Sequence, residues 1–241
     1  MEKLTINCDM GEGFGLYRFG DDEEVMPYVT HANIACGFHA GDPSVMWRTV
    51  KAAKRHGIHV GSHPGLPDRE GFGRREMKMT RDEVAALVLY QTGALMAFLN
   101  AESMSLTHIK PHGSLMGMAM KYAHVAEGVA DAALALHLPV IACWNSEMTR
   151  VLSARGVSYS CEFYCDLDYD DDGVQIISMQ HDPVSPELAV ERVRLALSNR
   201  QARSVNGKLV DVAVDSICVH SDTPGALPLA RAVHDAVADR L

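Results

Sequence analysis

Residues that can do chemistry recur along the chain where an apolar run gives way to a glycine-containing turn. Asp9, His39, Lys110 and His112 are the four that we predict to be catalytic. Imidazole and carboxylate groups can exchange protons with a substrate or bind a divalent metal ion. The ammonium of Lys110 can stabilise a developing oxyanion. These residue types predict an enzyme site.

Further polar residues near the ends of the same runs are predicted to bind the substrate. Each has a plainer explanation: an isolated His or Asp after a strand commonly caps a turn, and Arg74 beside Arg75 is commonly a solvated pair of charges. For Lys110 the alternative is a structural ion pair with Glu162 or Asp9. The predicted substrate-binding residues are Asn7, Asn33, His63, Arg74, Glu162 and His220.

A divalent metal ion is an open alternative. Its predicted ligands are Asp9, His39 and His112, with His63 as a substitute. The chain has no H-E-x-x-H motif, so a metal is allowed and not required. Neither G-x-x-x-x-G-K-[ST] nor a convincing G-x-G-x-x-G is found, so the chain carries no nucleotide site of a standard kind.

Strand-like and helix-like segments alternate along the chain, which is typical of a parallel sheet or barrel. In such folds the carboxyl ends of the strands lie on one face, where loops build the active site. All seven predicted strands end in polar residues, including Trp144 and Asn145 after the fifth. The predicted strands are 4–8, 29–36, 59–63, 106–111, 139–143, 157–162 and 215–220, and the predicted helices are 44–56, 81–100, 122–136, 147–154, 186–199 and 226–241.

Local signals mark the ends of several helices. Asp42 before a proline is a good N-cap, Thr80 with Glu83 forms a capping box, and Gly57 and Gly156 stand where helices should end. Residues 63–78 form a long loop, which in a compact domain is often functional. The Asp-Gly pair in residues 170–173 predicts a hairpin turn before an apolar run at 174–179.

Composition narrows the class of protein. The chain has 241 residues, 47% of them hydrophobic, and a net charge of −9 from 22 basic and 31 acidic residues. We expect a single α/β domain over 1–241, with no nucleic acid or membrane partner. The first residues lack a signal peptide's apolar region, and no apolar run approaches about 20 residues, so a cytoplasmic protein is expected. Six dispersed cysteines are expected to be reduced and buried.

Several segments, spread nearly end to end along the chain, match a known family. They are Asn7–Gly15, Ala32–Pro43, Gly61–Pro64 with Asp68 and Gly71–Arg75, Tyr90–Gln91 with Gly93–Leu95, Lys110–Gly113, and Cys218–His220 with Asp222–Pro224. Together they resemble the LamB/YcsF family, whose characterised activity is that of the 5-oxoprolinase A subunit, and residues 33–43 are the most specific part of the resemblance.

This resemblance implies a fold, an activity and partners. The implied fold is a seven-stranded parallel β/α barrel similar to the glycoside hydrolase/deacetylase fold. The implied activity is the ATP-dependent opening of the cyclic amide 5-oxoproline to glutamate. ATP would be used by the assembled complex, which would contain 5-oxoprolinase subunits B and C.

The chain departs from the family pattern at several positions. Leu167 and Ser178 stand where the family has arginines, Met116 stands where a tyrosine is usual, and Ser221 replaces a glycine. Leucine and serine cannot replace the bidentate contacts of a guanidinium, so another lactam, imide or cyclic amide is an alternative substrate. The other candidate functions are a metal-dependent deacetylase or hydrolase and a non-catalytic ligand-binding subunit. The sequence leaves open whether the chain forms a homo-oligomer.

Overall fold

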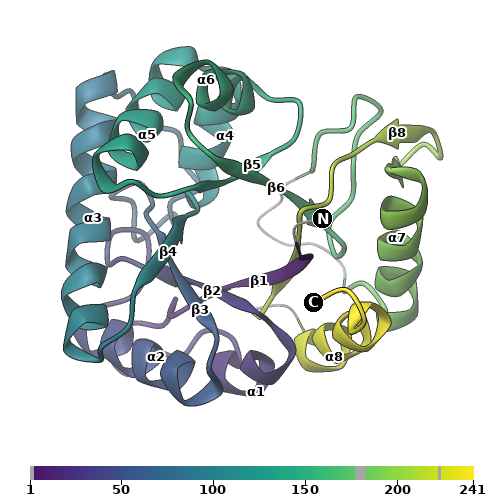
Figure 1. Cartoon of the computed structure of the whole chain (residues 1–241), viewed down its shortest axis with the longest axis horizontal. Helices are drawn as coiled ribbons and strands as arrows, with labels where there is room; N and C mark the ends of the chain where they lie inside the picture. Colours follow the sequence, from purple (N-terminus) through teal and green to yellow (C-terminus); the bar gives the residue numbers. More distant parts are fainter. Residues whose placement is uncertain (1–2, 177–182, 222–223) are drawn as a thin grey trace.

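The computed structural model describes residues 3–176, 183–221 and 224–241. Seven parallel strands close into a barrel, because β9 pairs with both β6 and β1 (Figure 1). This confirms the predicted seven-stranded β/α barrel. The strands of the barrel are β1 (Thr5–Met10), β2 (His31–Ala35), β3 (His59–His63), β4 (Leu106–Ile109), β5 (Val140–Cys143), β6 (Tyr159–Tyr164) and β9 (Ser216–His220).

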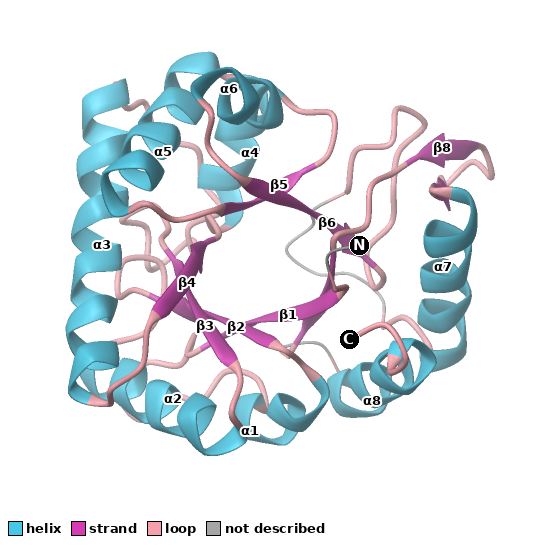
Figure 2. Ribbon diagram, viewed as in Figure 1, coloured by secondary structure: helices cyan, strands magenta, loops and turns pink. Residues whose placement is uncertain are grey.

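Helices surround the outside of the barrel (Figure 2). A two-stranded antiparallel sheet of β7 (Gln201–Arg203) and β8 (Leu209–Asp211) packs beside α7. The helices are α1 (Asp22–Val25), the 3-10 helix η1 (Met26–Tyr28), α2 (Pro43–His56), α3 (Arg81–Ala101), α4 (Gly113–Lys121), α5 (Ala123–Leu136), α6 (Glu147–Arg155), α7 (Pro186–Asn199) and α8 (Ala226–Val237).

The predicted helix ends are confirmed. The Asp42 side chain accepts two backbone N–H groups at the start of α2, and Thr80 and Glu83 form the capping box of α3. Gly57 and Gly156 end α2 and α6 with φ of 67° and 68°, a left-handed conformation that glycine adopts without steric cost. These ends fix where each helix returns the chain to the barrel.

Short elements were missed by the sequence analysis. The sequence predicted no helix for α1, η1 or α4 and no strand for β7 or β8. These elements have three to nine residues, so the hydrophobic period that identifies longer elements is weak in them. The predicted turn at 170–173 is present, with an isolated bridge between Tyr169 and Gln175. The apolar run predicted after it extends into residues 177–182, which lie outside the described residues.

Strand alternation separates the outer core from the barrel interior. On β1, Ile6, Cys8 and Met10 are fully buried among the apolar side chains under the helices. Because successive strand residues point to opposite faces, Asn7 and Asp9 point into the barrel. All six cysteines are buried and free, as predicted. The apolar outer layer thus holds a barrel whose interior is largely polar.

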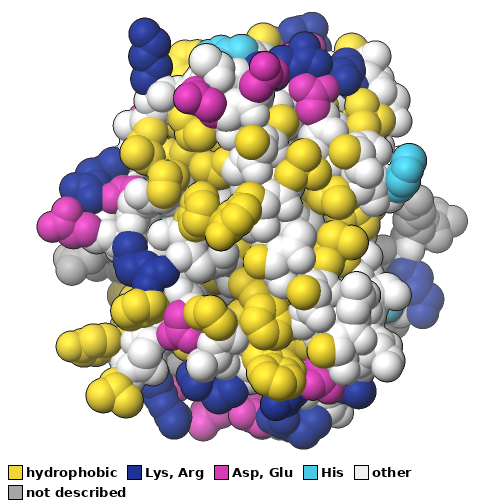
Figure 3. Space-filling model, turned by 90° about the vertical axis from the view of Figure 1, so that its left-hand side faces the viewer, with side chains coloured by type: hydrophobic (Ala, Val, Ile, Leu, Met, Phe, Trp, Pro, Cys, Tyr) yellow, Lys and Arg dark blue, Asp and Glu magenta, His cyan; other side chains and the backbone are white. Residues whose placement is uncertain are grey.

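The face on the left of Figure 1, where α3 lies, carries many hydrophobic side chains (Figure 3). Trp47 on α2 and Tyr90 on α3 are among the exposed large hydrophobic side chains. By length and composition, α3 is the one described helix that could cross a membrane, with a mean hydropathy of 1.5 over a window that is 39% buried. Because α3 also packs on α5 and the barrel, it is equally well explained as a core helix.

Candidate active site

The strand register brings polar side chains from different strands to the same level of the barrel. Asp9 lies opposite Asn33 on β2 and opposite His220 on β9. Glu162 on β6 lies opposite Ser216 on β9. Since all strands are parallel, the residues at their carboxyl ends share one mouth of the barrel. This mouth is the candidate active site.

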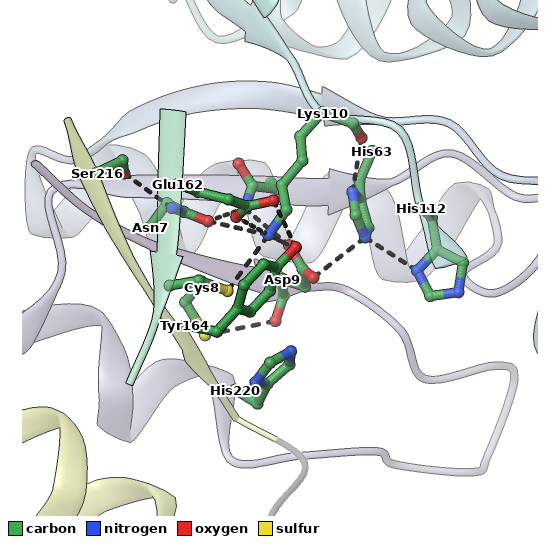
Figure 4. Close-up of polar contacts among 12 residues, drawn as sticks. Asn7, Cys8, Asp9, His63, Lys110, His112, Glu162, Tyr164, Ser216 and His220 are labelled. Atoms are coloured by element: carbon green, nitrogen blue, oxygen red, sulfur yellow. Dashed lines mark hydrogen bonds and ion pairs between the residues drawn. The ribbon is translucent and has the colours of Figure 1, made fainter. Parts of the chain in front are cut away.

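Lys110, just after β4, is at the centre of this interior (Figure 4). Its Nζ atom lies 3.0 Å from Asp9 Oδ1, 2.9 Å from Glu162 Oε2 and 3.0 Å from Asn7 Oδ1. Nζ donates hydrogen bonds to Asn7 Oδ1 and, at 3.3 Å, to Cys218 Sγ, so its three N–H groups are surrounded by these two groups and the two carboxylates. The charges of Asp9 and Glu162 hold the pKa of Lys110 well above its usual value, although its burial opposes this.

Asp9 is held ionised by its neighbours. Burial favours the neutral acid, but His63 and Lys110 together keep the pKa of Asp9 well below its ordinary value. The Asn33 side chain also donates to Asp9 Oδ1, at 2.7 Å. A carboxylate of such low pKa is a weak base, so this environment suits Asp9 to electrostatic and positioning roles better than to accepting a proton.

Below Asp9, a layer of hydrogen-bonded polar side chains fills the barrel interior. Asn33 donates to Asn7 Oδ1 at 2.9 Å, and His108 Nε2 donates to Asn33 Oδ1 at 2.6 Å. Gly61 makes room for His108, since a Cβ atom there would lie 2.1 Å from its Nε2 atom. Burial lowers the pKa of His108, so its ring stays neutral. These contacts fix the side chains that orient Asp9.

Four residues form a separate histidine cluster beside Asp9, composed of Glu12, His39, His63 and His112. The rings of His39 and His112 stack with centroids 3.7 Å apart. His63 Nε2 lies 3.0 Å from His112 Nδ1 and 3.3 Å from Asp9 Oδ2. Burial lowers the pKa of both His39 and His112, which favours neutral imidazoles.

The predicted long loop after β3 covers this cluster. Phe72 packs its ring against His39 and His112, and its carbonyl accepts from His112 Nε2 at 2.7 Å. Gly73 has φ of 66°, and a Cβ atom there would lie within 3 Å of both histidines. Arg74 lines the cavity at the barrel mouth. The neighbouring Arg75 instead pairs with Asp68 and Glu70.

On the other side of the mouth, Asp166 orients His220. Asp166 Oδ2 accepts from His220 Nδ1 at 2.9 Å and from its backbone N–H at 3.0 Å. Although burial opposes it, these contacts with His220 lower the pKa of Asp166. A carboxylate on Nδ1 fixes the tautomer of an imidazole and leaves Nε2 as the atom for proton transfer. This geometry would allow His220 to exchange a proton through Nε2.

The structure brings most of the predicted site residues together. Asp9, His63, Arg74, Lys110, His112 and His220 line one cavity, and Asn7, Asn33, His39 and Glu162 support it. The predicted metal ligands are divided differently: His39 and His112 group with Glu12 and His63, whereas Asp9 groups with Cys218 and His220.

One strand end does not follow the prediction. Trp144 and Asn145 after β5 are exposed and line a different surface hollow, so the expectation that all seven strand ends meet at the site is wrong there. The β5 residues are all apolar or Cys, and they pack as core.

The sequence analysis missed three residues that contribute to the site: Tyr164, His108 and Asp166. Tyr164 donates to Glu162 Oε1 at 2.6 Å, His108 donates to Asn33, and Asp166 orients His220. Period-two alternation back from Lys110 and forward from Glu162 could have found His108 and Tyr164. Leu167 and Met116, two departures from the family pattern, line the cavity. Ser178 lies outside the described residues.

A wider hollow of about 620 Å³ lies outside the barrel, between residues 13–26 and α2. Its charged lining includes Glu23 and Arg55, which pair with each other at the surface. It lacks the buried, mutually oriented acid, base and ammonium groups of the barrel mouth. The chemistry therefore places the candidate site in the barrel, not in this larger hollow.

Comparison with known proteins identifies relatives along nearly the whole chain. The model of the LamB/YcsF family matches residues 4–240. The lactam utilization protein lamB of Emericella nidulans is 43% identical over 95% of this chain and 91% of its own. The 5-oxoprolinase A subunit of Geobacillus thermodenitrificans is 43% identical, covering 98% and 94%. The crystal structure of the lactam utilization protein from Thermus thermophilus superposes with a TM-score of 0.91 at 37% identity, covering 98% and 96%.

Proposed function

The chain belongs to the LamB/YcsF family, and from that premise we propose that it is the barrel subunit of a hydrolase that opens cyclic amides. The proposed reaction is the conversion of 5-oxoproline to glutamate. Relatives named as 5-oxoprolinase A subunits align over nearly their full length and support this activity. The observation that carries the proposal here is the barrel mouth, where ionised Asp9 lies beside the Asp166–His220 pair.

The reaction adds water across the ring amide. The water oxygen bonds to the carbonyl carbon, the C–N bond breaks, and the ring nitrogen leaves as an amine after taking up a proton. His220, oriented by Asp166, is proposed to take the proton from water and return it to the nitrogen. Asp9, whose charge is held by Lys110 and His63, is proposed to position the water and the reacting carbonyl.

The arrangement around Lys110 changes its predicted role. An oxyanion donor needs an N–H group directed at the substrate, but the ammonium of Lys110 already has Asn7, Cys218 and two carboxylates around it. We therefore propose that Lys110 acts through Asp9 by holding this carboxylate in place and ionised. Its effect on the reaction is then indirect.

Arg74 is proposed to bind the carboxylate of 5-oxoproline. Its guanidinium lies at the cavity wall beside Phe72, with the cation 5.2 Å from the ring centre. Leu167 and Met116 provide an apolar wall where the family resemblance leads us to expect an arginine and a tyrosine. A single guanidinium next to this apolar wall also suits a less polar lactam, which remains the alternative substrate.

The amide of a relaxed five-membered ring is a poor electrophile, so we propose that ATP hydrolysis by the assembled complex drives its opening. The partners are proposed to be 5-oxoprolinase subunits B and C, and the word subunit in the relatives' names supports such an assembly. The test is to co-purify the chain with the products of its neighbouring genes and follow loss of 5-oxoproline with and without ATP. Robust turnover by this chain alone without ATP would contradict the coupled mechanism.

A further inference from the structure

In two histidines of the histidine cluster, one ring nitrogen donates a hydrogen bond to a backbone carbonyl. His63 Nδ1 lies 2.7 Å from the carbonyl oxygen of Lys110, and His112 Nε2 lies 2.7 Å from that of Phe72. A carbonyl oxygen only accepts, so the nitrogen on each ring must be the donor. On each ring the second nitrogen, His63 Nε2 or His112 Nδ1, is the one left to face another group.

Those two nitrogens face each other, and His63 Nε2 also lies 3.3 Å from Asp9 Oδ2. His63 Nε2 and His112 Nδ1 are 3.0 Å apart, as the dashed line between the two rings in Figure 4 shows. Two ring nitrogens this close are joined either by a shared proton or by a metal ion that both bind.

The rest of the cluster distinguishes these two choices. Glu12 Oε1 lies 3.1 Å from His39 Nε2 and 3.4 Å from His112 Nδ1. All four donor atoms lie within 4.8 Å of one another. One proton can join only two of these atoms, whereas one metal ion can bind all four. With bonds of 2.0–2.1 Å, neighbouring donors around tetrahedral zinc are about 3.3 Å apart, which is close to the three contacts above.

We propose that Glu12, His39, His63 and His112 together bind one divalent transition-metal ion of the zinc, manganese or cobalt class. Imidazole and carboxylate donors without thiolate suit these ions. The backbone carbonyls of Lys110 and Phe72 fix two of the ligand rings, as outer-shell acceptors commonly do in metal sites. The site rests on these contacts and does not depend on the proposed lactam reaction.

The second group of potential ligands, Asp9, Cys218 and His220, is a poorer site. Lys110 Nζ lies 3.0 Å from Asp9 Oδ1 and 3.3 Å from Cys218 Sγ. A fixed ammonium at this position repels a second cation. Burial also raises the pKa of the Cys218 thiol well above its usual value, which disfavours the thiolate that binds metals. The ion is therefore placed in the histidine cluster.

The test is a metal titration of the full chain, purified without chelators, assayed for bound metals, then stripped and titrated separately with Zn²⁺, Mn²⁺ and Co²⁺. The wild type is expected to bind about one ion per chain. Glu12→Gln and His63→Gln are expected to bind roughly tenfold or more weakly. His59→Ala is the matched control, because His59 is exposed at the opposite end of β3 and should leave binding unchanged.

Two readouts make the result independent of activity. The Co²⁺ absorption spectrum should show nitrogen and oxygen ligands without the strong charge-transfer band of a thiolate, which a site at Cys218 would produce. Metal should also raise the melting temperature of the wild type and of His59→Ala, and raise it less in Glu12→Gln. Failure of the wild type to bind any of the three ions stoichiometrically would overturn the proposal. The proposal would also be overturned if folded Glu12→Gln and His63→Gln both bound metal as tightly as the wild type. A thiolate band in the Co²⁺ spectrum would overturn it as well.

Discussion

The Nζ atom of Lys110 lies 3.0 Å from Asp9 Oδ1, inside a barrel where the lysine side chain is only 3% exposed. The same ammonium lies 2.9 Å from Glu162 Oε2. The single buried positive charge of Lys110 is therefore shared by two carboxylates in ion pairs. Breaking a buried pair by removing one partner is costly because the other charge is left without compensation. Lys110 is consequently a structural centre of the site as well as a contributor to its electrostatics.

Lys110→Met is expected to lower the free energy of unfolding by about 3–5 kcal/mol, because Asp9 and Glu162 would remain as uncompensated charges. Adding Glu162→Gln removes one of these charges, so the double variant should be more stable than Lys110→Met alone. Urea denaturation of the wild type, both single variants and the double variant measures this coupling. Additive effects of the two substitutions, or a Lys110→Met protein as stable as the wild type, would disprove the shared ion pair.

Asp166→Asn and His220→Gln are each expected to lower kcat roughly a hundredfold or more, because one misorients the proposed base and the other removes it. KM should change much less, since neither residue is proposed to bind the substrate's carboxylate. Steady-state kinetics in the assembled complex, with thermal melts of each variant, provide the measurement. Near wild-type kcat in a folded His220→Gln protein would reject the assignment of His220 as the base.

The pKa of Asp166 gives a prediction for acid stability. Its folded-state pKa lies below the ordinary value of 3.8, so its stabilising contribution is complete above that value and is lost as pH falls through the folded pKa. The wild type should therefore be more stable than Asp166→Asn at pH 7, and the difference should shrink below about pH 4. Urea denaturation at several pH values tests this. A difference that stays constant or grows under acid conditions would contradict it.

Arg74→Met is expected to raise KM for 5-oxoproline roughly tenfold or more with a smaller change in kcat, because a charge-assisted contact to the substrate carboxylate is lost. Arg150→Met is the control, since Arg150 is exposed on α6 and pairs there with Glu147 of the same helix. KM measured for 5-oxoproline and for an uncharged lactam separates loss of carboxylate binding from a general loss of substrate binding. An equal rise in KM for both substrates would argue against carboxylate binding by Arg74.

The pattern of strands and helices predicted a parallel sheet or barrel, because most of these elements are long enough to show a clear period, and the family resemblance then implied the seven-stranded barrel. Apolar runs alternated with helical segments, and caps such as Asp42 and Gly57 marked where helices begin and end. The polar strand ends then predicted one shared mouth. This step failed at Trp144, because a polar residue after a strand can equally belong to an exposed turn.

The partners within the site were harder to predict. Lys110 was predicted to be catalytic, with an ion pair to Glu162 or Asp9 as the alternative; it contacts both carboxylates, which only the closure of the barrel reveals. Asp166 follows β6 by two residues, but its contact with His220 depends on the pairing of β6 with β9, two strands that are far apart in the sequence. Local patterns identify candidate side chains, whereas long-range pairing decides which of them meet.

The central claim is that the barrel mouth around Asp9 is the active site of a cyclic-amide hydrolase. The most direct measurement compares wild type and Asp9→Asn, each assembled with the proposed partner subunits, in ATP-dependent loss of 5-oxoproline. Asn keeps the size of the side chain and removes its charge, so a folded variant isolates the role of the carboxylate. We predict that kcat/KM falls roughly a hundredfold or more. Wild-type turnover by folded Asp9→Asn would contradict the account.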